Sequence, residues 1–403
     1  MGIEGLWDAV RDVTGGETLP LARLNAEWVS QKGRPMRIAV DTPLAIFQYK
    51  SATAQVSGYG GKNHPTRTLY FATLHILRTG VQPVFIFDGP NKPRKLGRLM
   101  QPQHVPSQSP ARLSGRIEER EYDLNHISSL AKEMFDYLSI PWLIAAGEAE
   151  AECAALEQAN IVDAVLTRDG DSLVFGSRFV LEKLVADNGT AMIRAFRMDD
   201  LEKKDGKPRG PDDIITRKHL LQLALMSGGD YDKGIRGCGA KVALQAARSG
   251  NSCYILFNKI GRGEDPSKWR WRWVHDLKQS LEAKGHHAVA RSVPDVFPDP
   301  KIANYYLRPA VTSKDLLQSW AENVEWEKAI NVSKLRAFTE SNFDWRFAHL
   351  CGKFVRTLAD TALVKELWLS HQKGNDGSNL FEAIVQAKTD AKMGDQLRLS
   401  FRP

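Results

Sequence analysis

The sequence predicts an α/β fold built on a parallel sheet. Three apolar segments, MRIAVD, VFIFD and DAVLT, are typical of buried strands because they are short and rich in branched or aromatic residues. Asp41 closes the first segment, Asp88 closes the second, and Asp169 and Asp171 follow the third. Open parallel sheets place their sites at the carboxyl ends of their strands. We therefore expect these aspartates to meet at one edge of the sheet.

The segments around these strands predict helices and a hairpin. MGIEGLWDAV is typical of a short helix that carries Ile3, Leu6, Trp7 and Val10 on one side. Residues 65–79 predict an amphipathic helix that begins at a proline and is followed by a glycine. FVLEKL and TAMIRAF flank an Asn-Gly pair, which favours a tight hairpin at the edge of the sheet.

A basic unit with a glycine-rich loop is expected next. DDIITRKHLLQLALMSGGDYDKGIRGCGAKVALQAARSG predicts a helix, a loop, and a second helix that begins near Ala240. Asp230 would end the first helix and could reach the acidic edge. The segment from Tyr231 to Ile260 contains five basic residues and one acidic residue, Asp232. Backbone amides at the start of a helix bind phosphate readily, so the second helix is expected to hold duplex backbone.

The remaining chain predicts a helical tail followed by paired strands. KWRWRWVHDL alternates Trp269, Trp271 and Trp273 with arginines. This pattern is consistent with base stacking, but a partly buried amphipathic segment is the more frequent explanation. Residues 313–369 have helical patterning, whereas LFEAIVQAKT and DQLRLSFRP alternate as strands do and are expected to pair.

Composition limits the class of protein. With 403 residues and 42% apolar content, the chain can bury the core of one large or two modest domains. It has no apolar run of membrane-spanning length, no signal-peptide pattern, and four cysteines that lack zinc-ligand spacing. These features indicate an intracellular protein with reduced thiols and no membrane partner. The net charge of +7 predicts a polyanionic partner.

Acidic residues are concentrated in one part of this basic chain. Glu148 and Glu150 precede Asp169 and Asp171, so these carboxylates fall within about two dozen residues. Such charges repel one another unless a cation neutralises them, and a pair of divalent ions is the natural candidate. An acidic helix face exposed to solvent is the alternative. Strands that end in aspartate favour the metal site.

The segment between Asp88 and the acidic cluster is basic. From Gly89 to Arg120 it holds seven lysines or arginines, namely Lys92, Arg94, Lys95, Arg98, Arg112, Arg116 and Arg120. The last three repeat every four residues and would form a basic stripe on a helix, which could track a phosphate backbone. A solvated helix rim explains this segment equally well. Its position beside the acidic edge favours DNA or RNA.

Five motifs occur in order and together resemble the flap-endonuclease superfamily (XPG-like) of structure-specific nucleases. They are MGIEGLW, FDGPNKP, GEAEAECAAL, LTRDGDSLVFGS and MSGGDYDKGIRGCGAK, and the resemblance covers about residues 1–260. It implies a PIN-like nuclease core with XPG N and I regions and a helical arch over the site. A helix-two-turn-helix element and a helical C-terminal extension would follow this core.

The resemblance also implies domain boundaries. Residues 1–88 would form the N-terminal nuclease region, 89–140 the basic arch insertion, and 141–215 the internal nuclease region. Residues 216–260 would form the helix-two-turn-helix element and 261–377 the helical extension. Residues 378–403 would form a strand pair that could begin a chromodomain.

The resemblance further implies a metal site. Its metal-binding carboxylates would be Asp41, Asp88, Glu148, Glu150, Asp169, Asp171 and Asp230. Spacing alone leaves the second glutamate open, because residues two apart on a regular helix point about 200° apart. Glu148 would then share a face with Glu152. The family pattern selects Glu150 instead and requires Glu148 to lie at the start of the helix.

Basic residues and glycines would have roles in the same family pattern. Lys95 would lie near the scissile phosphate, assisted by Arg94 and Arg98, and Gly2 would line the site after removal of the initiator methionine. The segment Gly234–Lys241 would bind the unbroken strand, with K⁺ held by loop carbonyls. The expected DNA-binding residues are Lys92, Arg112, Arg116, Arg120, Lys233, Arg236, Gly237, Gly239 and Lys241.

The implied reaction is phosphodiester hydrolysis with two Mg²⁺ ions, for which Mn²⁺ can substitute. One ion would lower the pKa of the attacking water, and the other would offset charge on the leaving oxygen. The family's second basic position in the arch has no clean counterpart, since Pro102 falls near it.

Within the superfamily, the chain resembles the eukaryotic Holliday junction resolvase branch. GLW at the start, the short proline-rich segment and the long helical tail are the features that point there. The branch implies a nuclear protein that cuts four-way junctions and 5′ flaps. Each chain would supply one set of carboxylates and one cut, so we expect a monomer in solution that pairs as a homodimer on a two-fold symmetric junction.

Two alternatives remain. The first is a replication or repair 5′ flap endonuclease. The second is a non-catalytic scaffold that binds DNA junctions. Retention of the whole carboxylate set disfavours the scaffold, because an acidic cluster that faces DNA weakens binding unless metals are present.

Overall fold

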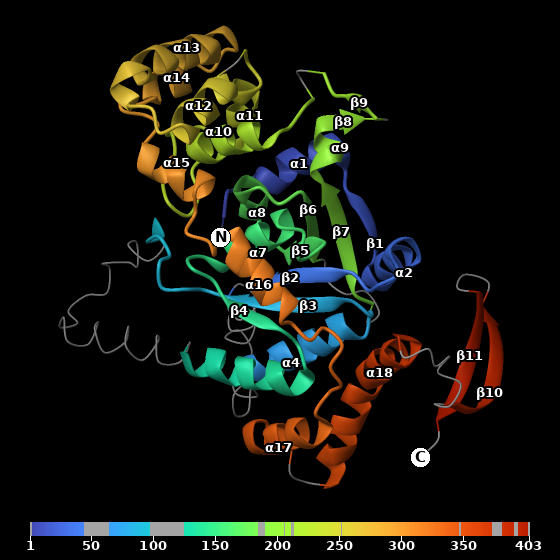
Figure 1. Cartoon of the computed structure of the whole chain (residues 1–403). Coiled ribbons are helices and arrows are strands. Elements are labelled where there is room, and N and C mark those ends of the chain that lie inside the picture. The colour runs from blue at the N-terminus through green and yellow to red at the C-terminus, as the bar shows by residue number, and fades with distance from the viewer. Residues whose placement is uncertain are drawn as a thin grey trace, which may run out of the picture.

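The structure is a computed structural model that describes residues 2–43, 64–96, 125–183, 190–204, 206–210, 213–250, 252–345, 348–372, 381–390 and 394–401. In these residues a seven-stranded sheet has the order β1-β7-β6-β5-β2-β3-β4 (Figure 1). The strands are β1 (Glu17–Pro20), β2 (Arg37–Asp41), β3 (Gln82–Phe87), β4 (Trp142–Ile144), β5 (Ala164–Thr167), β6 (Phe179–Lys183) and β7 (Met192–Arg197).

The parallel part of the sheet confirms the predicted fold class. Strand β2 lies between β5 and β3 and is parallel to both, and β6 and β4 continue the parallel pairing on the two sides. All strands of this part therefore end at the same edge. That edge receives the residues that follow β2, β3, β4 and β5.

The other part of the sheet is antiparallel. FVLEKL and TAMIRAF form β6 and β7, which pair antiparallel as predicted. The expectation that this pair forms the sheet edge is wrong, because β1 pairs with β7 on its outer side, with Leu19 opposite Ile193. The Asn-Gly turn itself lies outside the described residues.

Helices cover both faces of the sheet. The predicted helix over residues 65–79 is confirmed as α4 (His64–Leu77), and it packs with the helix over residues 125–138 against Phe85 and Phe87. Helix α7 (Ala149–Gln158) lies on the opposite face, where Val84 and Ile86 are buried. Alternate residues of β3 thus face opposite layers, as the two-residue period of a strand requires.

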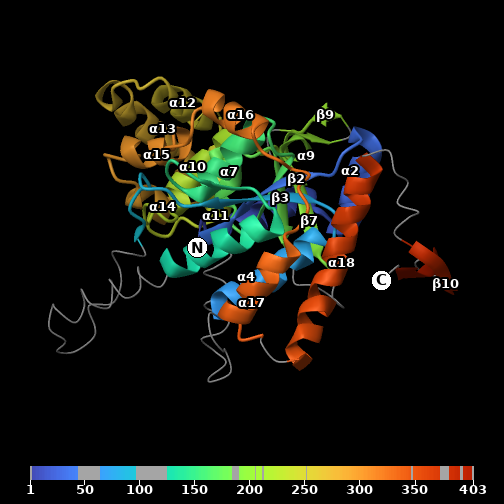
Figure 2. The same cartoon turned by 60° about the horizontal axis from the view of Figure 1, so that its bottom comes forward.

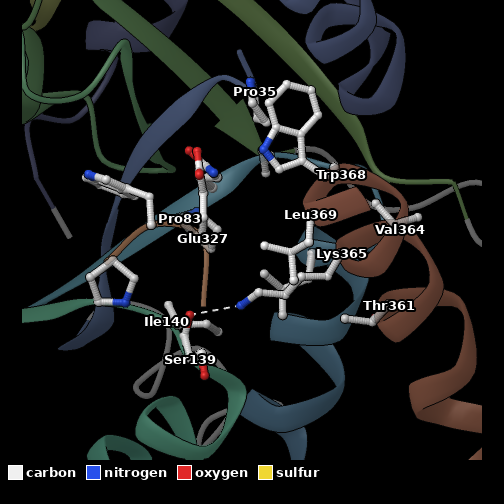
Figure 3. A pocket seen from close by; sticks show the side chains of 16 residues that line it. Pro35, Pro83, Ser139, Ile140, Glu327, Thr361, Val364, Lys365, Trp368 and Leu369 are labelled. Atoms are coloured by element: carbon white, nitrogen blue, oxygen red, sulfur yellow. Dashed lines mark hydrogen bonds between the residues drawn. The ribbon is translucent and has the colours of Figure 1, made fainter. Parts of the chain in front are cut away.

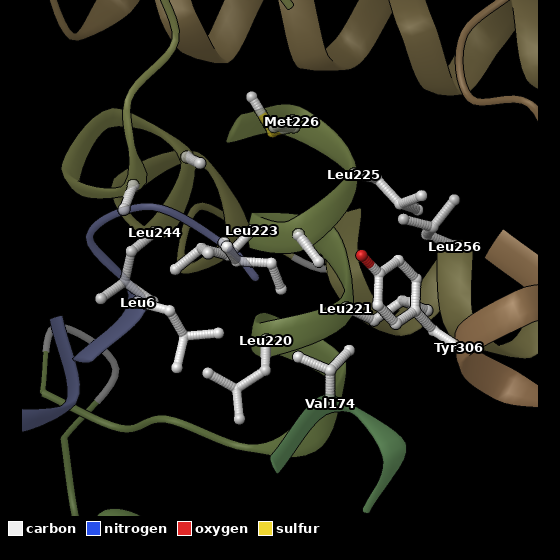
Figure 4. Close-up of a cluster of buried hydrophobic side chains, with 14 of the residues drawn as sticks. Leu6, Val174, Leu220, Leu221, Leu223, Leu225, Met226, Leu244, Leu256 and Tyr306 are labelled. Carbon is white, nitrogen blue, oxygen red and sulfur yellow. The ribbon is translucent and has the colours of Figure 1, made fainter. Parts of the chain in front are cut away.

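A second apolar core lies among helices. Most of it comes from α1 (Leu6–Thr14), α8 (Asp171–Phe175), α10 (Arg217–Ser227), α11 (Ala240–Ala247), α12 (Ser252–Gly261), α13 (Arg270–Ala283), α14 (His287–Ser292) and α15 (Pro300–Leu307). Ala154 of α7 and Val180 and Phe196 of the sheet also belong to it. Helix α10 is at the centre of this core, with Leu220 and Leu223 directed toward Leu6 of α1 (Figure 4). The predicted N-terminal helix is confirmed as α1, although Ile3 lies before its first residue.

The KWRWRW segment divides its tryptophans between core and surface. Trp269 and Trp273 are 7% and 3% exposed, whereas Trp271 is 68% exposed. Residues four apart share a helix face and residues two apart do not. The amphipathic interpretation is therefore confirmed for Trp269 and Trp273.

Helices and a strand pair follow α15. The predicted helical tail consists of α16 (Lys314–Glu322), α17 (Val332–Asn342) and α18 (Ala348–Gln372). Helix α18 packs against α4 (Figure 2). The Thr361 hydroxyl donates to the Leu74 carbonyl at 3.2 Å. Strands β10 (Phe381–Asp390) and β11 (Gly394–Phe401) pair antiparallel, as predicted.

The remaining elements of the described chain are α2 (Leu21–Lys32), α9 (Met198–Glu202), the β8 (Lys203–Lys204) and β9 (Lys207–Pro208) pair, and a 3₁₀ turn at Pro266–Lys268. In the described ranges, no helix combines the length and the apolar content that crossing a membrane requires. Cys153, Cys238 and Cys253 are free and buried.

Candidate metal centre

The carboxyl edge of the sheet gathers the predicted aspartates. Asp41 is the last residue of β2, Asp88 follows β3, and Asp169 lies two residues beyond β5. Asp41 and Asp169 are each only 4% exposed. Burial of these acidic side chains argues against a solvated acidic surface, because a buried charge needs a compensating partner.

Glu148 and Glu150 reach the site from the start of α7. Glu148 is the N-cap residue, with an extended backbone (φ −85°, ψ 139°), and α7 begins at the next residue. The 200° separation of a regular helix therefore does not apply to Glu148 and Glu150. Both carboxylates lie within 3.5 Å of the Lys95 ammonium, so the structure brings them to one point.

The amino terminus of the chain forms part of the site. The Gly2 N–H donates to Asp230 Oδ1 at 2.9 Å, and the Ile3 N–H donates to Asp171 Oδ1 at 3.0 Å. Gly2 has a φ of 88°, and a Cβ at this position would lie 2.1 Å from Asp169 Oδ1. A side chain cannot fit there without moving Asp169. Gly2 therefore lies directly against Asp169 and Asp230.

Lys95 lies among the carboxylates. Its ammonium nitrogen is 2.7 Å from Asp230 Oδ2, 3.0 Å from Glu148 Oε1 and 3.5 Å from Glu150 Oε1. The sequence places Asp230 at the end of α10, but that helix ends at Ser227 and Asp230 lies in the following loop. The Leu96 N–H donates to the Asp230 carbonyl at 2.7 Å, which holds the Lys95 segment against this loop.

Asp88 and its basic neighbours lie at the rim. The Lys92 ammonium is 2.9 Å from Asp88 Oδ2, and the Ala149 N–H donates to Asp88 Oδ1 at 3.1 Å. Arg94 is exposed. The four other predicted arginines, Arg98, Arg112, Arg116 and Arg120, lie outside the described residues, as does Pro102.

Three of the carboxylates can hold a metal ion in common. One oxygen from each of Glu150, Asp169 and Asp171 lies within 4.8 Å of the others. Carboxylate oxygens are the ligands that Mg²⁺ and Mn²⁺ prefer. The donor set therefore fits a hard divalent cation.

The electrostatics of the cluster also fit a cation. Burial, followed by the charges of Glu150 and Asp230, raises the pKa of Asp171 to about 7. Burial and Asp169 raise the pKa of Glu150, and burial and Asp171 raise the pKa of Asp169. Because neighbouring carboxylates raise these pKa values in addition to burial, negative charge is in excess within the cluster.

Lys95 relieves that excess on one side of the cluster. Burial alone would raise the pKa of Asp230, but the Lys95 ammonium lowers it below its usual value. Burial opposes the charge of Lys95, yet Glu150, Glu148 and Asp230 outweigh burial and raise the pKa of Lys95. Lys95 therefore stays charged.

The predicted DNA-binding loop presents its basic residues to solvent. Lys233, Arg236 and Lys241 are exposed, while Ile235 and Cys238 between them are buried. Gly237 is in the left-handed region (φ 80°), and Gly239 is the N-cap residue of α11, which begins at Ala240 as predicted. A Cβ at either glycine would meet nothing within 4 Å. The start of α11 is thus open to an approaching phosphate backbone.

Tyr231 is a residue of the site that the sequence did not indicate. It follows Asp230 directly, is buried, and donates its hydroxyl hydrogen bond to Glu148 Oε2. Burial and Glu148 raise the pKa of Tyr231, so the phenol stays protonated as a donor. An aromatic residue next to an aspartate has no distinctive spacing, so only the tertiary contact reveals this role.

A small cavity lies at the opposite edge of the sheet. It measures about 50 Å³ and lies between the amino ends of β2, β3 and β4 and helix α18, with Pro35, Pro83, Ile140 and Trp368 in its wall (Figure 3). The Lys365 ammonium donates there to the Ser139 carbonyl at 3.0 Å. This cavity has no part in the carboxylate site.

Comparisons with known proteins agree with this geometry. The XPG I-region family model matches residues 139–230. Flap endonuclease 1 of Mus musculus is 28% identical over an alignment of 300 residues, and the match covers 70% of this chain and 74% of that protein.

Two solved structures resemble almost the whole chain. The Holliday junction-resolving enzyme GEN1 in complex with product DNA and Mg²⁺ is 30% identical, with a TM-score of 0.71, and the match covers 99% of this chain and 87% of that one. The eukaryotic junction-resolving enzyme GEN-1 with potassium is 29% identical, with a TM-score of 0.74, and the match covers 99% of this chain and 87% of that one.

Proposed function

Because this chain belongs to the flap-endonuclease superfamily of structure-specific nucleases, we propose that it resolves four-way DNA junctions by paired cuts and also cleaves 5′ flaps. The observation that carries this proposal is the buried group of Glu150, Asp169 and Asp171, with the Lys95 ammonium beside Glu150. A buried set of oxygen donors next to a cationic side chain suits hydrolysis of a phosphodiester.

The predicted carboxylates would hold two Mg²⁺ ions, for which Mn²⁺ can substitute. When bound, the ions would activate water and offset charge on the leaving oxygen. Glu150, Asp169 and Asp171 provide one compact set of donors, and Glu148, Asp230 and Asp41 lie beside them. Asp88 lies at the rim with Lys92.

Other residues orient this set. The Ile3 N–H holds one oxygen of Asp171, and the Tyr231 hydroxyl holds one oxygen of Glu148. Lys95 provides a positive charge that a phosphate oxygen can contact in place of the carboxylates. Arg94, the preceding residue, is exposed and would assist Lys95.

The loop between α10 and α11 would bind the unbroken part of the DNA. Lys233, Arg236 and Lys241 are exposed at the open start of α11. Helix amino ends and lysine or arginine side chains contact phosphates without reading bases, which suits an enzyme that recognises shape. Loop carbonyls would hold K⁺ here, in keeping with the similar GEN-1 structure that binds potassium.

Junction resolution is favoured over flap cleavage alone by the extent of the structural match. The GEN1 structure, which is 30% identical, matches 99% of this chain, so the match includes the helices beyond α12. We infer a monomer in solution that pairs as a homodimer on a junction, because two opposed cuts need two sites. A nuclear location fits such an enzyme.

A nuclease assay tests this function directly. Purified protein should cut a four-way junction and a 5′ flap in Mg²⁺, leave plain duplex largely intact, and cut nothing in EDTA. Cleavage of the flap alone would favour the flap endonuclease alternative. Tight junction binding without cleavage in Mg²⁺ or Mn²⁺ would favour the scaffold and contradict the proposal.

A further inference from the structure

A short connection between α15 and α16 lies directly against the start of the metal-site helix α7. This connection, residues 308–313, is called the brace below. In Figure 1 the chain passes from α15 to α16 beside α7, and a hydrogen bond joins Thr312 of the brace to Glu152 of α7. The helical extension is therefore joined to the site itself.

Glu152 makes the first contact with the brace. Its side chain is fully buried, and both carboxylate oxygens lie 3.1 Å from the Thr312 backbone nitrogen. Its Oε2 also accepts from the Ala146 N–H at 3.2 Å. Within the described ranges no lysine or arginine forms an ion pair with Glu152, so backbone N–H groups provide its hydrogen bonds.

A second contact is steric. A Cβ on Gly147 would lie 2.6 Å from the Ala310 carbonyl oxygen, so the brace backbone occupies the space beside Gly147. Gly147 immediately precedes Glu148. The Gly89 N–H donates to the Gly147 carbonyl at 2.7 Å, which ties the same loop to the residue after Asp88.

A third contact comes from α15. The ring centroids of Tyr305 and Tyr306 lie 5.2 Å and 5.0 Å from that of Tyr231. Tyr231 donates to Glu148, so the Tyr231 ring links α15 to Glu148. Glu152 lies about one helical turn beyond Glu148, and the Glu152 N–H donates to the Glu148 carbonyl at 3.1 Å.

These contacts converge on one role. We propose that Glu152 is a positioning residue which, by joining Thr312 of the brace to Ala146, fixes the start of α7 and so sets Glu148 and Glu150 for metal binding. The inference rests on the proposed function, since it assumes that these carboxylates take a divalent ion. Groups behind metal ligands tune metal affinity in this way, and their loss commonly weakens binding by about 10–100-fold.

The test measures Mn²⁺ binding in the absence of DNA, from the loss of the free-ion electron paramagnetic resonance signal. Glu152→Met keeps length and removes both acceptor oxygens, and it should weaken Mn²⁺ binding by about tenfold or more. Glu152→Gln keeps one oxygen and should fall between wild type and the Met variant. The Mn²⁺ concentration for half-maximal flap cleavage should rise in the same order, with the KM for DNA unchanged.

Glu157 provides the matched control. It is also a buried carboxylate on α7, but it accepts from the Arg178 N–H at 3.0 Å, and among the described residues it forms no hydrogen bond with the brace. Glu157→Met should lower the melting temperature as a buried substitution does, with Mn²⁺ affinity unchanged.

The outcomes separate the two claims. A folded Glu152→Met chain with wild-type Mn²⁺ affinity overturns the positioning role, and if that chain does not fold, Glu152→Gln with wild-type affinity overturns it. Equal weakening in Glu157→Met also overturns it, because general destabilisation would then explain the loss. A wild-type chain that takes up no Mn²⁺ counts against the proposed function instead.

Discussion

The ammonium nitrogen of Lys95 lies 2.7 Å from Oδ2 of Asp230, and the next residue, Leu96, donates its N–H to the Asp230 carbonyl, also at 2.7 Å. This double contact joins the segment after β3 to the loop before α11. Asp230 therefore connects Lys95, which is expected beside the scissile phosphate, to the loop that is expected to bind duplex DNA.

Lys95→Ala should lower the cleavage rate by about 100–1,000-fold, because it removes a positive charge aimed at the reacting phosphate. Mn²⁺ binding should tighten, since the ammonium lies within 3.5 Å of Glu148, Glu150 and Asp230 and competes with a divalent ion. Single-turnover cleavage and Mn²⁺ titration measure the two effects. Lys92→Ala is the control, because its ammonium pairs with Asp88 at the rim, and both effects should be smaller. An unchanged rate in Lys95→Ala contradicts its role.

Without metal, stability should fall as pH rises. The pKa of Asp171 is about 7 in the folded chain and about 4 when unfolded. Between these values the unfolded chain loses the proton while the folded chain keeps it, so the folded state becomes less stable as pH rises. In EDTA the melting temperature should decline from about pH 4 to pH 7. Asp171→Asn should reduce that decline and abolish cleavage, whereas the exposed Asp199→Asn should do neither. Identical pH profiles for wild type and Asp171→Asn would contradict the burial argument.

Arg236→Glu and Lys241→Ala should weaken binding to every duplex-containing substrate about equally. Both side chains are exposed at the start of α11, where they would meet phosphates and not bases. The slope of log affinity against log salt should become shallower by about one unit for each phosphate that the variant no longer neutralises. Arg356→Ala removes an exposed charge on α18 and is the control. An unchanged slope in the loop variants would place these residues outside the DNA surface.

Gly2→Ala should slow cleavage by about tenfold or more while junction binding stays near that of wild type. The added Cβ would lie 2.1 Å from Asp169 Oδ1 and would displace that carboxylate. Gly33→Ala is the control: Gly33 has the same left-handed backbone conformation (φ 69°), but a Cβ there would have no atom within 4 Å. Its effect therefore measures backbone strain without the collision. Equal rates for the two variants would mean that the collision has no effect on the site.

The sequence predicts the strand ends well because parallel pairing alone brings them together. Asp41, Asp88 and Asp169 follow apolar strands, and neighbouring parallel strands must end at one edge. The sequence also predicts the start of α11, because glycines precede a helical pattern there. Strand β1, with the sequence ETLP, is too short to show a period, which explains the mistaken edge position of β7.

Local pattern fails where a role depends on a distant contact. Regular helical spacing pairs Glu148 with Glu152, but Glu148 lies at the N-cap with an extended backbone and joins Glu150 instead. The Glu152 carboxylate accepts a hydrogen bond from Thr312, which is distant in the sequence. Tyr231 donates to Glu148, which is also distant in the sequence. Spacing along one segment cannot reveal such contacts, because they arise only when α15 and the brace pack against α7.

The most direct test of junction resolution by paired copies is cleavage of a supercoiled plasmid that extrudes a cruciform. Wild-type protein in Mg²⁺ should give linear DNA as its main product, because two copies cut opposed strands within one complex. Mixing wild type with an excess of Asp171→Asn should shift the product to nicked circles, since mixed pairs contain one active site. Nicked circles from wild type alone, or equal cutting of a plasmid without the cruciform, would contradict paired resolution.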